Sequence, residues 1–193
     1  MVALASLTVP SVAGAAPALP PIGRASRVVA RFDDPATVET WRPLDDRVMG
    51  GRSRSSAAWS PEAALVFAGE LSLEQGGGFA SLRAEVGPMD LRGTTGLLLL
   101  ARGDGRDYRL NLRDRALAQR ADEGTQFRAT FRAESGGWQR CWLAWSAFAA
   151  TRRGRLLPGV APLSLDAIVS VGLMTAFREP GPFRLELRSI EAI

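Results

Sequence analysis

Apolar and polar residues alternate with a period of two along most of the chain from Val28 onwards, which is the pattern of half-buried β-strands. The clearest examples are RDYRLNLRD at 106–114, TQFRATFRA at 125–133 and PFRLELRSI at 182–190. The run TGLLLLAR at 95–102 is continuously apolar, as expected for a strand at the centre of a sheet. The pattern predicts about eight or nine strands and very little helix.

Short segments rich in Gly, Pro, Asp and Ser separate the predicted strands. The segment GDG at 103–105 favours a tight hairpin, because glycine accepts the positive φ that such turns require. The side of segment 65–73 predicted to face the core carries Leu65, Phe67, Leu71 and Leu73. One-sided alternation predicts an all-β sandwich, in which two antiparallel sheets each bury one face.

The length of 193 residues favours one domain, which we expect to span residues 28–193. Residues 1–27 are predicted to be a flexible tail or the remnant of a signal peptide, since A-x-A occurs at 13–15 without a preceding basic region. Prolines and small residues make this segment a poor membrane span. The composition predicts a protein of the bacterial cytoplasm, or a periplasmic or secreted protein if residues 1–22 are a signal-peptide remnant.

The 24 basic residues are all arginine, and the chain has no histidine. The missing histidine excludes Ser-His-Asp and Cys-His catalysis and histidine-ligated metal sites. The net charge of +4 comes from arginines scattered along the chain, which disfavours nucleic-acid binding. The single cysteine, Cys141, lies in the apolar segment WQRCWLAW, so a buried side chain is favoured over a nucleophile.

The acidic residues suggest little catalytic chemistry. Asp104 and Asp107 are candidates for paired acid chemistry, but the hairpin already accounts for Asp104. The adjacent pairs at 33–34 and 45–46 offer oxygen ligands for a hard cation, although neighbouring side chains on an extended chain point apart. We therefore expect no enzyme, no cofactor and no metal site, with a structural calcium ion as the open alternative.

Five segments occur in a characteristic order: WRPLDDRVMGGRSRSS at 41–56, FAGELSLEQGGGFASLRAE at 67–85, ARGDGRDYRLNLRD at 101–114, GWQRCWLAWSAF at 137–148 and GPFRLELRSIEAI at 181–193. Together they resemble the complex I intermediate-associated protein 30 family. The most specific motifs are D-x-V-M-G-G-x-S at 46–53 and G-G-F-A-S-x-R at 77–83. The resemblance implies a galactose-binding-domain-like jelly roll, similar in architecture to carbohydrate-binding modules. It also implies an assembly factor for respiratory NADH:ubiquinone oxidoreductase.

The first motif admits a structural and a functional interpretation. In the structural one, its glycines adopt a turn, with positive φ expected at Gly51, and Val48 and Met49 plug one end of the core. In the functional one, it meets the glycine-rich loop at a rim that contacts a ligand or partner. The candidate residues of the motif loop are Asp46, Arg47, Met49, Gly50, Gly51 and Ser53, and those of the second loop are Gly77, Gly78, Phe79, Ser81 and Arg83.

The polar side of the predicted strands is a second candidate surface. It is either a solvated face with cross-strand charge pairs or a site for sugar hydroxyls, a carboxylate or a phosphate. Its main residues are Arg109, Asn111, Arg113 and Arg128. Trp138 and Trp142 share one side of their strand and lie outside the core if Cys141 points inward.

We expect a non-catalytic binding module or scaffold with protein partners, by resemblance an assembly factor that binds intermediates of the oxidoreductase. The alternative is a carbohydrate-binding or small-anion-binding module. Neither function requires a transmembrane span.

Overall fold

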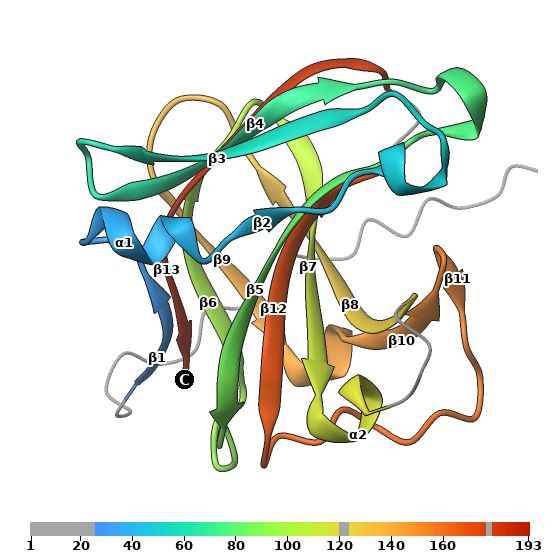
Figure 1. Cartoon of the computed structure of the whole chain (residues 1–193). Helices are drawn as coiled ribbons and strands as arrows, with labels where there is room; N and C mark the ends of the chain where they lie inside the picture. Colours follow the sequence, from blue (N-terminus) through green and yellow to red (C-terminus); the bar gives the residue numbers. More distant parts are fainter. Residues whose placement is uncertain (1–25, 120–123, 177–178) are drawn as a thin grey trace, which may run out of the picture.

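Two antiparallel β-sheets packed face to face form the body of the protein in the computed structural model, which describes residues 26–119, 124–176 and 179–193 (Figure 1). The predicted tail therefore lies outside the described residues except at its end, where β1 begins at Arg27. Helical segments are short: α1 (Pro35–Glu39), α2 (Arg115–Ala118), and the 3-10 turns η1 (Asp46–Met49), η2 (Glu74–Gly76) and η3 (Trp145–Ala147). The predicted all-β sandwich is confirmed.

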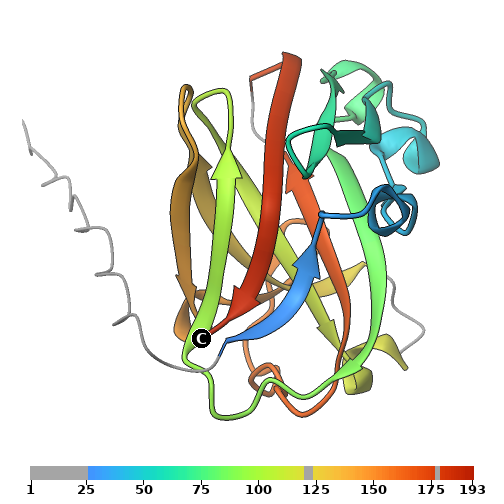
Figure 2. The same ribbon diagram turned by 90° about the vertical axis from the view of Figure 1, so that its left-hand side faces the viewer.

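The first sheet has the strand order β3-β4-β13-β6-β9, and β1 pairs with the end of β13 (Figure 2). Its strands are β1 (Arg27–Arg31), β3 (Arg54–Ser60), β4 (Ala64–Leu71), β6 (Gly96–Arg102), β9 (Gln139–Ala144) and β13 (Gly181–Ala192). The strand β3 is an edge of this sheet.

The second sheet has the strand order β11-β10-β8-β7-β12-β5-β2. Its strands are β2 (Arg42–Pro43), β5 (Ala80–Met89), β7 (Arg106–Asp114), β8 (Thr125–Ala133), β10 (Ala149–Arg152), β11 (Arg155–Leu156) and β12 (Ile168–Thr175). The strands β5, β12 and β7 run side by side at the front of Figure 1. Strands of two residues, such as β2 and β11, are too short to show a period in the sequence.

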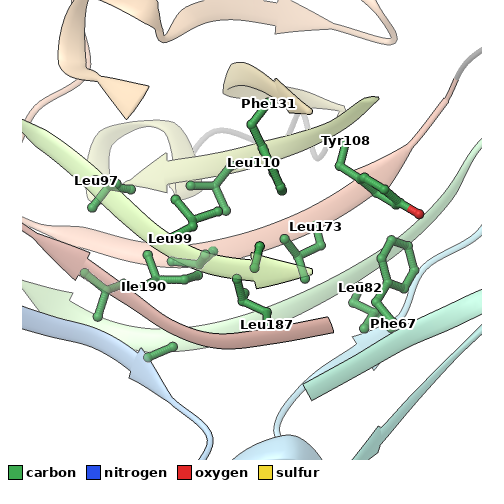
Figure 3. Close-up of a cluster of buried hydrophobic side chains, with 14 of the residues drawn as sticks. Phe67, Leu82, Leu97, Leu99, Tyr108, Leu110, Phe131, Leu173, Leu187 and Ile190 are labelled. Carbon is green, nitrogen blue, oxygen red and sulfur yellow. The ribbon is translucent and has the colours of Figure 1, made fainter. Parts of the chain in front are cut away.

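The apolar alternates of both sheets meet in one core (Figure 3). Tyr108 is fully buried there, and its hydroxyl donates to Asp104 Oδ1 at 2.9 Å. Burial, together with the neighbouring Asp104 charge, raises the pKa of Tyr108 far above its ordinary value. Asp104 also accepts the backbone N–H of Arg106 at 3.2 Å and that of Arg184 at 2.8 Å, so its role is to hold the hairpin in place.

The structure shows which side chains around β4 and β9 face the core. The prediction that Leu73 faces the core is wrong: β4 ends at Leu71, and the Leu73 side chain is exposed in the following loop. In β9, Cys141 is buried, so Trp138 and Trp142 lie on the outer side and are only partly covered. Within the described residues, no helix has the length and apolar character needed to cross a bilayer.

Candidate functional site

Asp46, the first residue of η1, joins two distant loops through its buried carboxylate. Its Oδ1 accepts the backbone N–H of Ser53 at 2.9 Å, and its Oδ2 accepts the Ser53 hydroxyl at 2.6 Å. The same Oδ2 accepts the N–H groups of Gly78 at 2.7 Å and Phe79 at 3.2 Å. The two motif loops are thus bonded to each other, and they lie together as the cyan and green turns at the upper right of Figure 1.

The neighbouring carboxylate of Asp45 makes a parallel set of bonds. It accepts the N–H of Ser55 at 2.7 Å, the Ser55 hydroxyl at 2.6 Å and the N–H of Ser81 at 3.0 Å. These bonds satisfy edge groups of β3 and attach that edge to β5 in the other sheet. We call Asp45 and Asp46 the aspartate clamp.

Two glycines leave room for the clamp. A Cβ at Gly51 would lie 2.4 Å from the Asp46 carboxyl carbon, and one at Gly77 would lie 2.6 Å from Asp46 Oδ2. Gly50, not Gly51, has the positive φ, at 89°, where it caps η1. The prediction of positive φ at Gly51 is therefore wrong; the residue must be glycine because it packs directly on the carboxylate.

The Asp46 carboxyl is ionised at neutral pH. Burial raises its pKa, but the hydrogen bonds from Ser53, Gly78 and Phe79 together outweigh burial. The net result is a pKa below the ordinary value of 3.8, because these donors stabilise the charged form.

Val48 and Met49 do not plug the core, which corrects the sequence-based prediction. Their side chains are 69% and 66% exposed, respectively, on the outside of η1. Leu73, in the loop before η2, is 43% exposed and lies beside Gly78. We call residues 46–53 and 73–79 together the motif rim; it presents these three apolar side chains, with Arg47 also exposed.

The remaining candidates of the second loop are divided between two places. Phe79 is half-buried at the rim. Ser81 is buried, donating its hydroxyl to the Leu44 carbonyl and its N–H to Asp45, so it is bonded to the clamp and does not offer a ligand contact. Arg83 lies further along β5, on the outer face of the second sheet opposite Gly172.

That outer face carries the predicted arginine surface. Strand pairing aligns Arg83, Gly172, Asn111 and Arg128 in one row across β5, β12, β7 and β8. Arg109 lies two positions along β7 from Asn111, on the same side of the strand. We call Arg83, Arg109, Asn111 and Arg128 the arginine face. Asn111 is only 6% exposed, so this is not the fully solvated surface that one interpretation expected.

Arg113 has a different environment from the other predicted residues of this surface. It is buried, and its Nη2 donates to the carbonyl of Leu117 in α2 at 3.2 Å. It therefore holds α2 against the end of β7.

Reactive groups are scarce among the described residues. Cys141 is buried, and burial raises the pKa of its thiol, which leaves it protonated and unreactive at neutral pH. Within residues 26–119, 124–176 and 179–193, no three Cys, Asp or Glu side chains gather as a metal-binding set. The oxygens of the aspartate clamp accept hydrogen bonds from N–H and O–H groups. Such donors would repel a cation, so the clamp is not arranged as a cation site.

Signals for the clamp were partly present in the sequence. The motif had identified Asp46 and Ser53, but Asp45 and Ser55 were missed as a pair. The alternation of Ser53 and Ser55 at the start of a strand, preceded by two adjacent aspartates, is the pattern that matches the observed bonds.

Comparison with known proteins identifies a family match over most of the chain. Residues 30–187 match the family described as complex I intermediate-associated protein 30. The mitochondrial protein of that name from Mus musculus is 30% identical over 182 residues, covering 84% of this chain and 54% of the mouse protein. A protein from Caenorhabditis elegans, described as probably the same mitochondrial protein, is 29% identical, covering 84% of this chain and 52% of its own length. The chain spans about half the length of these relatives.

Solved structures support the jelly-roll fold. A family 11 carbohydrate-binding module from Clostridium thermocellum, in complex with a mixed-linked tetrasaccharide, superposes with a TM-score of 0.65 at 16% identity, covering 87% of this chain and 95% of the module. Part of an agarase superposes with a TM-score of 0.59 at 14% identity, covering 88% of this chain and 24% of the agarase. At these identities the likeness concerns the fold alone.

The comparisons also correct the predicted location. Both relatives are mitochondrial proteins of animals, which contradicts the prediction of a bacterial cytoplasmic protein. The arginine-only composition, from which a bacterial origin was inferred, did not predict the mitochondrial location of these relatives.

Proposed function

Because this chain belongs to the complex I intermediate-associated protein 30 family, we propose that it is a non-catalytic protein-binding module that assists the assembly of respiratory NADH:ubiquinone oxidoreductase. The chain spans about half the length of these two relatives, so the proposal concerns the function of the part that they share with it.

The observation that carries the proposal is the exposure of Val48 and Met49 on a fixed turn. Water-exposed apolar side chains of this size are commonly sites of protein contact when they gather in one place. Here they share the motif rim with Leu73, and all three exceed 40% exposure.

The clamp makes this surface suitable for binding. The η1 turn is held at Asp46 by bonds to Ser53, Gly78 and Phe79, so its tip is ordered before any partner arrives. A pre-ordered contact loses less conformational entropy on association than a mobile loop would. The same residues that define the family motif therefore fix the proposed contact surface.

The chemistry of the described residues supports a non-catalytic role. The chain has no histidine, its one thiol is buried, and Asp104 is engaged in the hairpin. The carbohydrate alternative is supported only by likeness of fold.

The test is affinity capture of the tagged chain from the cells that make it, followed by mass spectrometry. We expect subunits of the oxidoreductase to be recovered with the wild-type chain and to be lost with the double variant Val48→Asp and Met49→Asp. The matched control is Leu156→Asp, which changes a side chain of 71% exposure on β11, at the edge of the second sheet opposite to β2. Equal recovery by all three proteins would refute the role of the rim, and recovery of no oxidoreductase subunit by the wild-type chain would refute the assembly function.

A further inference from the structure

A groove of about 530 Å³ lies along the edge of β3 that faces away from β4. Its other wall is built by α1 and β2, which both contact β3 and lie below it in Figure 1. Val38 and Trp41 line the groove and are almost fully buried, so its floor is apolar. We call this space, lined by residues from 35–43 and 55–59, the edge groove.

Backbone groups of β3 point into the edge groove. Ser55 lines it, and its N–H points away from β4, since it donates to Asp45 Oδ2 at 2.7 Å. Backbone direction alternates along a strand, and the pairing of β3 with β4 runs without a shift from 54 to 60. The N–H and C=O groups of Ala57 and Trp59 therefore also point away from β4. Within the described part of the chain β3 pairs with β4 alone, so these groups have no strand partner.

The groove is ordered before any ligand arrives. The Trp59 indole Nε1 donates to the carbonyl of Phe32 at 3.0 Å, and the Phe32 ring packs against Trp41 with ring centres 5.7 Å apart. Trp59 nevertheless remains 36% exposed, so part of its ring is available for contact. A fixed site of this kind loses little conformational entropy on binding.

The walls admit a single strand. An isolated extended segment fits between β3 and the wall formed by α1 and β2. A second copy of the chain would bring its own α1 and β2 to the same edge, which disfavours pairing of β3 with β3. The occupant that matches unpaired N–H and C=O groups on a strand edge is another extended backbone.

Charge favours an acidic residue at one end of the segment. Arg42 lines the groove, and Arg47 follows it on the chain at the motif rim; both are exposed, and neither makes an ion pair within the described residues. The acid that lines the groove, Glu39, lies at its α1 end. The end near the clamp, where Ser55 bonds Asp45, is therefore positive and complementary to a carboxylate.

From this arrangement we propose that the edge groove binds an extended segment of a partner protein, which adds to β3 as a further strand and places an acidic residue near Arg42. Its backbone pairs with Ala57 and Trp59, and its alternate side chains face the apolar floor. The inference deepens the proposed function and rests on it only in that the partner is a protein.

The experiment is selection of a phage-displayed library of random peptides, each long enough for one strand, on the purified full chain. We expect enriched peptides that carry an acidic residue. Ala57→Pro removes the N–H that points into the groove and breaks no bond to β4, so the chain should fold and bind these peptides about tenfold or more weakly. Ala57→Ser keeps the N–H and is the conservative replacement that should retain binding. Arg42→Gln should weaken binding by about threefold or more.

Hydrogen exchange of backbone amides tests the site even if Ala57→Pro does not fold. With a selected peptide bound to the wild-type chain, the amides of Ala57 and Trp59 should exchange about tenfold or more slowly than in the free chain. The amides of Ser56 and Ala58, which face β4, should change less.

The inference is overturned if the library yields no binder, if selected peptides bind Ala57→Pro as tightly as Ala57→Ser, or if Arg42→Gln leaves their binding unchanged. Unchanged exchange at residues 57 and 59 in the complex would also overturn it. So would either of two other occupants: a dimer that Ala57→Pro dissociates, or the neutral sugar cellotetraose slowing the same two amides. The selection contains no oxidoreductase, so its failure leaves the assembly function to the affinity capture described above, and failure of that capture leaves the groove to be decided by the selection.

Discussion

The carboxylate of Asp46 accepts the backbone N–H of Gly78 at 2.7 Å across 32 positions of sequence, and this bond joins the two most specific motifs of the sequence, at 46–53 and 77–83. Both motifs contain paired glycines, and one glycine of each, Gly51 and Gly77, packs against the same carboxylate. The two motifs therefore form one structural unit. Their residues hold the surface on which the proposed protein contact depends.

The first prediction concerns the charge of the clamp. Asp46→Asn replaces one acceptor oxygen with an NH₂ group that faces the N–H donors around it. We expect a loss of about 2–4 kcal/mol in the free energy of unfolding, since several buried donors lose their acceptor together. Ser53→Ala removes the acceptor of the Ser72 N–H but leaves the three N–H groups that bond Asp46 paired, and should lose only about 1–2 kcal/mol. Urea unfolding measures both, and equal small losses would contradict a central role for the carboxylate.

A second prediction distinguishes the two glycines of the first motif. Gly50→Ala introduces a side chain at φ 89°, with open space around it, and should cost about 1–2 kcal/mol. Gly51→Ala places a methyl group 2.4 Å from the Asp46 carboxyl carbon, which its hydrogen bonds hold in place. The loss at Gly51 should be the larger one in thermal unfolding. The opposite ranking would show that backbone conformation, not contact with Asp46, requires the glycine.

A third prediction follows from the lowered pKa of Asp46. A carboxyl whose pKa is lower in the folded state contributes stability above its unfolded pKa, near 4, and loses it as pH falls through the folded value. The wild-type chain should therefore lose stability below about pH 4, and its advantage over Asp46→Asn should shrink there. Unfolding curves at a series of pH values measure this difference; a gap that stays constant down to pH ~2 would contradict the assigned pKa direction.

A fourth prediction concerns Trp138 on the outer side of the first sheet. The guanidinium carbons of Arg188 and Arg102 lie 4.2 Å and 4.8 Å from its ring centre. Arg188→Ala should cost about 0.5–1 kcal/mol and expose one face of the ring. Quenching of the Trp138 fluorescence by the neutral quencher acrylamide, obtained by difference from Trp138→Phe, should rise in Arg188→Ala and not in Arg140→Ala. Unchanged quenching would show that the stacking does not shield the ring.

The sequence predicted the parts of the fold that depend on local pattern. Strands with clear alternation, such as β7 and β8, were found where expected, because burial of one sheet face imposes a period of two. The meeting of the two loops was expected only as an interpretation of the motif. The bonds of Asp45 to Ser55 and Ser81 depend on the packing of two sheets, and no local pattern specifies them.

The exposure of Met49 was missed for a related reason. An apolar residue that precedes two glycines is compatible with either a plug or a surface contact, and only the direction of η1 decides between them.

The most direct measurement of the proposed function is the amount of finished NADH:ubiquinone oxidoreductase in cells that lack this chain, resolved on native gels. We predict that the finished enzyme decreases and that smaller assembly intermediates accumulate. The wild-type chain and Leu156→Asp should restore assembly, and the Val48→Asp and Met49→Asp double variant should not. Normal amounts of the finished enzyme in the absence of the chain would contradict the assembly function.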